Sequence, residues 1–371
     1  MAQIRELSDG RVIMNDNVRR RLLVYEPTLT RFTALADSAG GSVQAYGPAP
    51  LGLLRGKGDT TWIVDPVSLS ILVLDSACAV VRVKALPFPD DVARLLPGRN
   101  GSGGLDARGR LVYRGFGMEG GRSTGAGIIA QVTTPDSLPI VRIDMATRAV
   151  DTVSFVRPFR STLTLARSAE GRLTSTELIN PLQVVDEWTV TSDDRIVIVR
   201  GKDYSIEFLG ERREETVARV IPFPWRAMSD SAKAAFLDSA RVAAARLRDG
   251  ALAAALAGES AGRASGVFRP ADGGTPFAAE QVFVDALALP DYAPPFLPGA
   301  VVADRAGNVW IRTSNTSNGQ PVYDVVNSLG RLVDRVRLPS GRVIVGFGRT
   351  SVFLAVRGAN GLASLEKATV R

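Results

Sequence analysis

Histidine is absent from all 371 residues, and cysteine occurs once, at Cys78. The first absence excludes a Ser-His-Asp triad, histidine-ligated zinc and imidazole acid–base catalysis. A single cysteine excludes an intrachain disulfide and a thiolate metal cluster, and its apolar neighbours predict a small core residue. No apolar run reaches the length of about 18 residues that a membrane span requires. We therefore predict no membrane span, and we assign no catalytic residue, no metal ligand and no cofactor.

Lysine is also scarce, so the formal net charge of +7 comes almost entirely from arginine. The arginines are spread along the whole chain. A nucleic-acid-binding surface would need this positive charge to cluster. We therefore interpret the arginines as a solvated surface and expect no nucleic-acid partner.

A repeating pattern is clearest in Val301–Leu338. A strand-like run, Ala300–Ala303, is followed by the tight turn Asp304-Arg305-Ala306-Gly307, in which glycine can take a positive φ without steric cost. Four short strands joined by such turns make one antiparallel sheet, which can bury both faces only by stacking on copies of itself. The remaining strands of this copy are predicted at Asn308–Arg312, Val322–Val326 and Arg331–Leu338.

Six copies of this pattern can be placed along residues 1–371, which we interpret as one domain. Equivalent turns are spaced by about 40 to 50 residues where nothing is inserted. The first strands are predicted at Ile4–Leu7, Gly52–Arg55, Gly104–Asp106, Glu187–Thr191, Ala300–Ala303 and Arg342–Phe347. The second strands are predicted at Arg11–Asp16, Thr61–Asp65, Leu111–Arg114, Ile196–Arg200, Asn308–Arg312 and Ser351–Arg357.

Three turn motifs resemble those of six-bladed β-propellers of the TolB-like and NHL-like kind, and more closely those of the secreted bacterial members of that group. They are Ser8–Val12, Asp106–Leu111 and Asp304–Trp310. The resemblance covers nearly the whole chain outside one helical insertion. It implies an all-β six-bladed propeller and a periplasmic or extracellular location, although MAQIRELSDGR has no hydrophobic segment of a signal peptide. The group spans lactonases, receptors and scaffolds, so the resemblance implies no single activity.

The sixth copy supplies three strands. In the resembling family, an N-terminal strand commonly completes the last blade and closes the ring. We therefore expect that an upstream strand, and with it a secretion signal, precedes this sequence; a three-stranded last blade is the alternative.

The long insertions all fall on one face of such a ring. The connections between blades and the loops between second and third strands share a face, which we call the insertion face. The turns on the opposite face, the short-turn face, stay short in every copy. Because long loops on a rigid scaffold often carry binding residues, we expect the insertion face to be functional. The insertions are residues 115–139, 157–186, 222–298 and 313–321.

One helix is predicted, in an insertion between the fourth and fifth blades at about residues 226–260. Ser229 or Asp230 can cap its N-terminus, and Gly250 can end it, after which Ala251–Ala257 can form a second, weaker turn or two. We expect it to pack on the ring, with a mobile lid or a partner-binding helix as alternatives. Its apolar side is predicted to contain Phe236, Ala240, Ala243 and Leu247.

The candidate ligand-binding residues come from the ends of second strands, which we expect to ring the mouth of a central channel. Arginines that converge there favour an anionic ligand, such as a carboxylate or a phosphate, held bidentately. The alternative is that each arginine pairs with a neighbouring acid in a structural rim. The candidates are Asp16, Asp65, Arg114, Arg200, Asp203, Tyr204 and Arg312.

Two functions of different classes remain open. The first is a non-enzymatic, monomeric propeller that binds a small anion or an unknown protein through its insertion face. The second is a lactonase-type hydrolase, in which a calcium-like ion polarises a carbonyl group. Oxygen ligands for such an ion could come from Asp16, Asn17, Asp65, Asp203 and Asn315. Arginines at the same mouth would repel a cation, so we favour the binding function.

Overall fold

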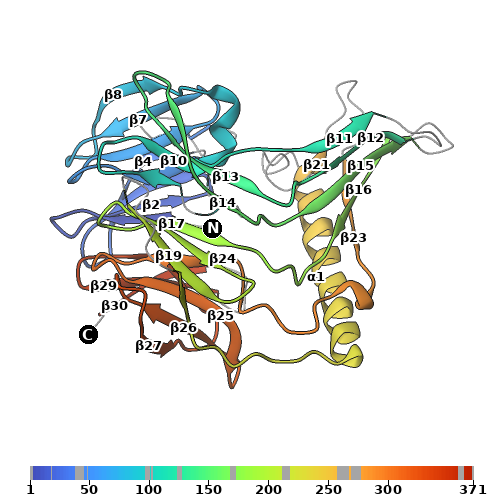
Figure 1. Ribbon diagram of the computed structural model, residues 1–371. Helices are drawn as coiled ribbons and strands as arrows, with labels where there is room; N and C mark the ends of the chain where they lie inside the picture. The colour runs from blue at the N-terminus through green and yellow to red at the C-terminus, as the bar shows by residue number, and fades with distance from the viewer. Residues whose placement is uncertain are drawn as a thin grey trace.

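The computed structural model describes residues 3–17, 19–37, 46–47, 49–96, 101, 103–122, 128–167, 173–210, 218–256, 267–268, 277–357 and 363–369. Most of these residues lie in small antiparallel β-sheets, and one long helix stands apart from them (Figure 1). Six of the sheets follow one another in chain order, each with three or four strands.

These six sheets have the following strands. The first sheet contains β1 (Gln3–Glu6), β2 (Val12–Asp16), β3 (Arg21–Tyr25) and β4 (Phe32–Asp37). The second contains β5 (Gly52–Arg55), β6 (Thr61–Asp65), β7 (Ser70–Leu74) and β8 (Val80–Ala85). The third contains β9 (Gly104–Leu105), β10 (Leu111–Arg114), β13 (Leu138–Ile143) and β14 (Val150–Val156). The fourth contains β17 (Glu187–Val190), β18 (Ile196–Arg200), β19 (Ser205–Leu209) and β20 (Arg219–Val220). The fifth contains β24 (Phe296–Ala303), β25 (Val309–Ser317), β26 (Gln320–Val326) and β27 (Leu332–Arg337). The sixth contains β28 (Arg342–Phe347), β29 (Ser351–Arg357) and β30 (Ala363–Thr369).

The first strands of the six sheets form a closed ring. Strands β1, β5, β9, β17, β24 and β28 contact one another in this order, and β28 contacts β1 again. Apolar cores fill the spaces between neighbouring sheets: Leu22 packs with Ile63, and Phe208 packs with Val309. Each sheet therefore buries its faces against its neighbours, an arrangement consistent with a β-propeller.

The strand and turn predictions agree closely with this structure. Strands β6, β10, β18 and β29 begin and end at the predicted residues. In the turn that follows β24, Oδ1 of Asp304 accepts hydrogen bonds from the backbone N–H groups of Ala306 and Asn308, both at 2.8 Å. Gly307 has the expected positive φ, +83°. The local turn chemistry thus determined where these strands start and stop.

The strands inside the insertions were not predicted from the sequence. The predicted polar loop at residues 313–321 is instead the end of the hairpin of β25 and β26. Residues 115–139 contain β11 (Glu119–Arg122) and β12 (Ile128–Thr133), and residues 157–186 contain β15 (Ser161–Arg167) and β16 (Leu173–Ile179). These four strands pair in the order β11-β12-β15-β16, and β23 (Glu280–Phe283) from the third insertion adds to β16 in parallel. Three insertions thus form one five-stranded sheet on one side of the ring (Figure 1).

Helix α1 (Asp230–Leu256) lies within the predicted helical insertion, next to this sheet (Figure 1). Ser229 caps it, because its Oγ accepts a hydrogen bond from the N–H of Ala232 at 3.2 Å. The predicted break at Gly250 is wrong, since one continuous helix includes the turns expected after it and ends at Leu256. A glycine inside a helix costs only about 1 kcal/mol relative to alanine, so it does not by itself stop one.

The predicted buried side of α1 is also wrong in its lower half. Leu247 is 75% exposed, and Ala243 is exposed as well. The side that packs on the insertion runs instead through Lys233, Leu237 and Ala240. Leu237 contacts Leu182 and Leu289 in a small apolar core. Lys233 is buried there, and its Nζ donates to Oδ1 of Asp291 at 2.8 Å.

The remaining described elements are short. They are the 3-10 turns η1 (Pro89–Arg94) and η3 (Ala286–Ala288), and a two-stranded pair of β21 (Val267–Phe268) with β22 (Phe277–Ala278). Among the described residues, no helix has both the length and the apolar character needed to cross a membrane.

Candidate functional site

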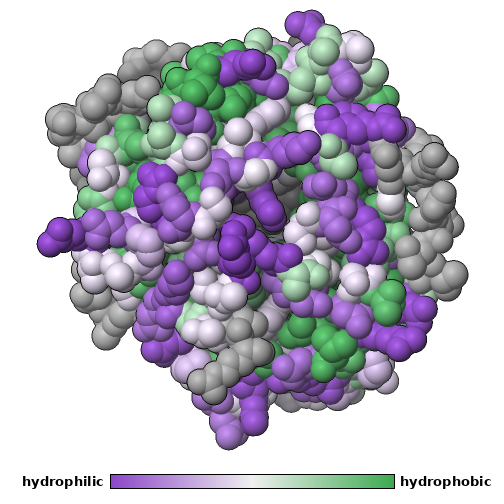
Figure 2. Space-filling view, turned by 90° about the vertical axis from the view of Figure 1, so that its left-hand side faces the viewer, coloured by the Kyte–Doolittle hydropathy of each residue, from purple (hydrophilic) through white to green (hydrophobic). Residues whose placement is uncertain are grey.

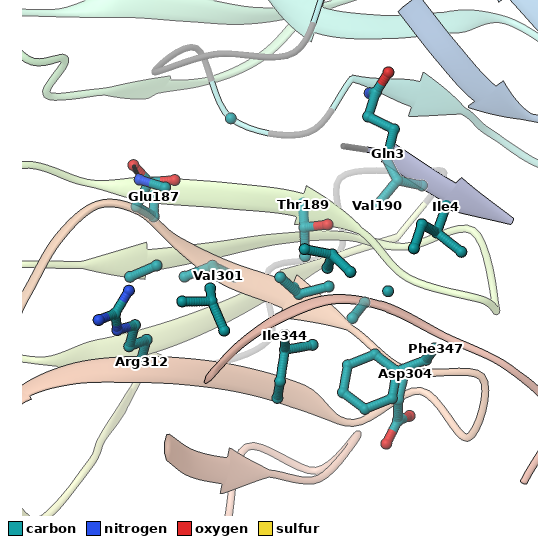
Figure 3. A pocket seen from close by; sticks show the side chains of 18 of the residues that line it. Gln3, Ile4, Glu187, Thr189, Val190, Val301, Asp304, Arg312, Ile344 and Phe347 are labelled. Carbon is teal, nitrogen blue, oxygen red and sulfur yellow. Dashed lines mark hydrogen bonds between the residues drawn. The ribbon is translucent and has the colours of Figure 1, made fainter. Parts of the chain in front are cut away.

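A cavity of about 590 Å³ occupies the centre of the ring. Its walls come from the first strands of the sheets, including Ile4 of β1, Leu53 of β5, Thr189 of β17, Val301 of β24 and Ile344 of β28. Figure 3 shows four of these side chains, Ile4, Thr189, Val301 and Ile344, around the cavity. Since first strands run from the insertion face to the short-turn face, the cavity has one end toward each face.

The end toward the insertion face combines a buried acid with an arginine. Glu187 begins β17 and Arg312 lies in β25, and both lie at the same end of the cavity in Figure 3. Glu187 is 4% exposed, and its Oε1 accepts a hydrogen bond from the N–H of Gly299 at 2.8 Å. Burial raises the pKa of Glu187 to about 7, although the nearby Arg114 charge acts to lower it. This carboxyl group therefore changes charge near neutral pH.

Arg312 has the opposite character. Its side chain is exposed to the cavity, and it forms no hydrogen bond or ion pair with another described residue. A guanidinium in this state can bind a carboxylate or phosphate through two parallel hydrogen bonds.

The opposite end opens on the short-turn face. Figure 2 shows this face, on the side away from α1, and hydrophilic side chains surround a hollow near its middle. Arg5, Arg55 and Arg305 line the cavity at this end. Asp304 and Phe347 also lie at this end, away from Glu187 and Arg312 (Figure 3). The two ends of the cavity thus present different sets of charged groups.

Of the seven residues predicted for the site, Arg312 is the one that lines this cavity within the described part of the chain. Arg200 is engaged by protein groups: its Nε and Nη2 donate to Glu207 at 2.9 and 3.1 Å, and its Nη1 donates to Asp186 at 3.0 Å. Arg114 is 8% exposed, and the charge of Glu187 acts on it. The structure therefore places Arg114 near the cavity wall and Arg200 in an ion-pair network.

The predicted acids and the tyrosine have local partners. Asp16 pairs with Arg21 at 3.3 Å. Asp65 accepts hydrogen bonds from the N–H of Val67 at 2.9 Å and from Oγ of Ser68 at 2.6 Å. Asp203 accepts a hydrogen bond from Oγ of Ser205 at 2.8 Å. Tyr204 is fully buried, and its hydroxyl donates to Oδ2 of Asp324 at 2.9 Å.

No group of three or more Asp, Glu, Cys or His side chains that could hold a metal ion occurs among the described residues. The carboxylates proposed for a calcium-like ion come from three different sheets: Asp16 ends β2, Asp65 ends β6, and Asp203 lies in the turn before β19. Nothing in their geometry adds support to the hydrolase alternative.

Sequence reasoning missed the residues that the first strands contribute. It compared the ends of second strands, whereas the cavity walls come mainly from first strands, including Arg5, Arg55 and Glu187. A signal was available: in a stack of sheets around an axis, the first strand of each sheet lies nearest that axis. Comparing equivalent positions on first strands would have found these residues.

Comparisons with known proteins add little. No family model matches the sequence, and no curated protein matches it. Solved structures that resemble the fold include virginiamycin B lyase from Staphylococcus aureus, with a TM-score of 0.41 and 11% identity over 99% of this chain and 94% of that chain. Another is the hydrazine synthase of Kuenenia stuttgartiensis, with a TM-score of 0.39 and 9% identity over 99% and 95% of the two chains. At such low TM-scores, these likenesses carry no argument about function.

Proposed function

We propose that this protein is a non-enzymatic, six-bladed propeller of the TolB-like or NHL-like kind that binds a small anionic ligand at the insertion-face end of its central cavity. The six chain-ordered sheets around a closed ring support the blade count. The resemblance of the turn motifs supports a periplasmic or extracellular location.

One observation carries the proposal: Arg312 is exposed in a cavity of about 590 Å³ and has no acidic partner among the described residues. An arginine without a protein partner, inside a concave site, is suited to the anionic group of a ligand. Glu187 at the same end adds a second polar contact. When protonated, its carboxyl group can donate a hydrogen bond to an oxygen of the ligand.

The ligand class follows from this pair. Arg312 favours a carboxylate or a phosphate, and the neutral form of Glu187 tolerates the negative charge of the ligand. A small carboxylate that also has a hydroxyl group can contact both side chains. We expect such ligands to bind more tightly below pH 7 than above it, because ionised Glu187 repels an anion.

Isothermal titration calorimetry with a panel of small hydroxycarboxylates and phosphates tests the proposal. Arg312→Ala is expected to weaken binding about tenfold or more, as the loss of one charge-assisted contact implies. Arg331→Ala removes an exposed arginine in the turn before β27 and serves as the matched control. Equal binding by both variants would exclude the Arg312 site. Stabilisation by calcium that a chelator reverses would favour the hydrolase alternative instead.

A further inference from the structure

Three arginines from three different sheets meet at the short-turn end of the cavity. Arg5 lies in β1, Arg55 ends β5, and Arg305 lies in the turn that follows β24. Burial, and after it the like charges of Arg55 and Arg305, lower the pKa of Arg5 to about 10. Burial and then the charge of Arg55 also lower the pKa of Arg305. The three guanidinium groups are thus close enough to repel one another.

The hydrogen-bonding capacity of Arg5 is only partly used. Arg5 is only 5% exposed. Nη2 donates to the backbone oxygens of Gly58 at 2.6 Å and of Gly56 at 3.4 Å. Nε and Nη1 are buried, and neither has a hydrogen-bond acceptor among the described residues. Buried charged donors almost always have acceptors, so this guanidinium calls for an additional partner.

The other two arginines leave room for the same partner. The side chain of Arg55 is exposed at the mouth and makes no hydrogen bond or ion pair within the described part of the chain. Arg305 donates from Nη2 to the backbone oxygen of Glu6. Because Arg55 is exposed, its side chain can rotate to admit a ligand to the buried donors of Arg5.

Two of the carboxylates near these arginines, Asp59 and Glu6, already have other hydrogen-bond donors. The charge of Arg55 also acts on Asp194, but no ion pair joins the two among the described residues. Asp59 acts electrostatically on Arg5 and Arg305, but its Oδ1 accepts from the N–H of Ser8 at 2.9 Å, and its Oδ2 accepts from Oγ of the same serine. Glu6 accepts from the N–H of Arg349 at 2.6 Å. No ion pair between these acids and Arg5, Arg55 or Arg305 is formed among the described residues.

We propose that Arg5, Arg55 and Arg305 form a second anion-binding site, at the short-turn mouth of the cavity, for a ligand with a carboxylate or a phosphate group. The oxygens of such a group would accept hydrogen bonds from the buried donors of Arg5 and from the exposed guanidinium of Arg55. Its negative charge would also offset the repulsion among the three arginines. The site shares no residue with the Glu187 and Arg312 end, so it goes beyond the proposed function.

Titration calorimetry with inorganic phosphate and with succinate, at constant ionic strength set with sodium chloride, tests this site. Arg55→Ala is the main variant, because its exposed side chain contributes little to folding. We expect it to weaken binding of the preferred anion about tenfold. Arg31→Ala, which removes an exposed arginine next to β4, is the matched control and should bind as the unaltered protein does. Tighter binding of phosphate or of succinate identifies which of the two groups the site takes.

A third variant separates this site from the proposed function. Arg312→Ala should leave binding at the short-turn mouth unchanged, and Arg55→Ala should leave binding at the insertion-face end unchanged. The proposal is overturned if neither anion binds more tightly than chloride. It is also overturned if Arg55→Ala and Arg31→Ala bind equally well while Arg312→Ala alone loses binding.

Arg305→Ala provides a second, independent variant of the same mouth, and it should weaken binding of the same anion.

Discussion

Glu6 and Lys367 join the first sheet to the last. The Nζ of Lys367 donates to Oε1 of Glu6 at 3.1 Å, although 361 residues separate the two along the chain. The carboxylate is nearly buried, with 7% of the side chain exposed. Its Oε2 also accepts a hydrogen bond from the N–H of Arg349, and its Oε1 accepts one from Oγ of Ser351. One carboxylate thus holds strands β1 and β30 together where the ring closes.

Glu6→Gln is expected to destabilise the protein by about 1–3 kcal/mol, because it removes a buried charge that holds a lysine and two further donors. Urea denaturation, followed by the intrinsic fluorescence of tryptophan, measures the change. Glu366→Gln is the control: it lies next to Lys367 in β30 and pairs with Arg342 in a more exposed ion pair. Its denaturation midpoint should shift far less. Similar shifts for the two variants would show that the closure contact has no special role.

Glu187 should make the stability of the protein depend on pH. Burial raises its pKa from 4.5 to about 7, while Arg114 lowers it and Asp186 raises it. Between these pH values the folded state retains a proton that the unfolded chain has released. The protonated carboxyl group therefore contributes fully to stability below pH 4.5, and this contribution is lost as the pH rises through about 7. The loss is about 3 kcal/mol, at 1.36 kcal/mol per pKa unit. Glu187→Gln, which keeps an acceptor for the N–H of Gly299, should remove this component from thermal denaturation profiles measured between pH 5 and 8. An unchanged profile would mean that Glu187 is ionised throughout that range.

The buried hydroxyl of Tyr204 links the fourth sheet to the fifth through Asp324. Tyr204→Phe leaves Oδ2 of Asp324 without this donor, while Arg335 still donates to its Oδ1 at 3.0 Å. We expect a loss of about 1–2 kcal/mol in the free energy of unfolding. Tyr292→Phe, at a residue that is 55% exposed, is the matched control and should be nearly neutral. Chemical denaturation of both variants checks the difference, and equal stability would argue against the inter-sheet contact.

Two leucines of α1 test the side on which the helix packs. Leu237 is 2% exposed and Leu247 is 75% exposed. Leu237→Ala should cost about 2–4 kcal/mol, because it opens a cavity against Leu182 and Leu289. Leu247→Ala should change the stability by less than about 0.5 kcal/mol. Circular dichroism during thermal unfolding measures both. The reverse order would restore the helix face that the sequence pattern predicted.

The strand pattern could be predicted because its causes are local. Asp304, Asn327 and Asp106 each accept backbone N–H groups within the next few residues, so each turn is specified by side chains adjacent in sequence. The helix face was predicted less well: the periodic pattern placed Leu247 on the packed side, whereas Leu237 is the buried leucine. Which side is buried depends on Leu182 and Leu289, which lie far from α1 in the chain.

The sequence by itself therefore determined the positions of most strands in the six chain-ordered sheets, and the turns between them. Only the tertiary structure decided that three insertions pair into one sheet, since β16 must meet β23 across about a hundred residues of chain. Only the tertiary structure, too, brought Arg5, Arg55 and Arg305 to one mouth and Glu187 and Arg312 to the other. Turns depend on hydrogen bonds between neighbouring residues, whereas the cavity depends on how distant strands meet around a common axis.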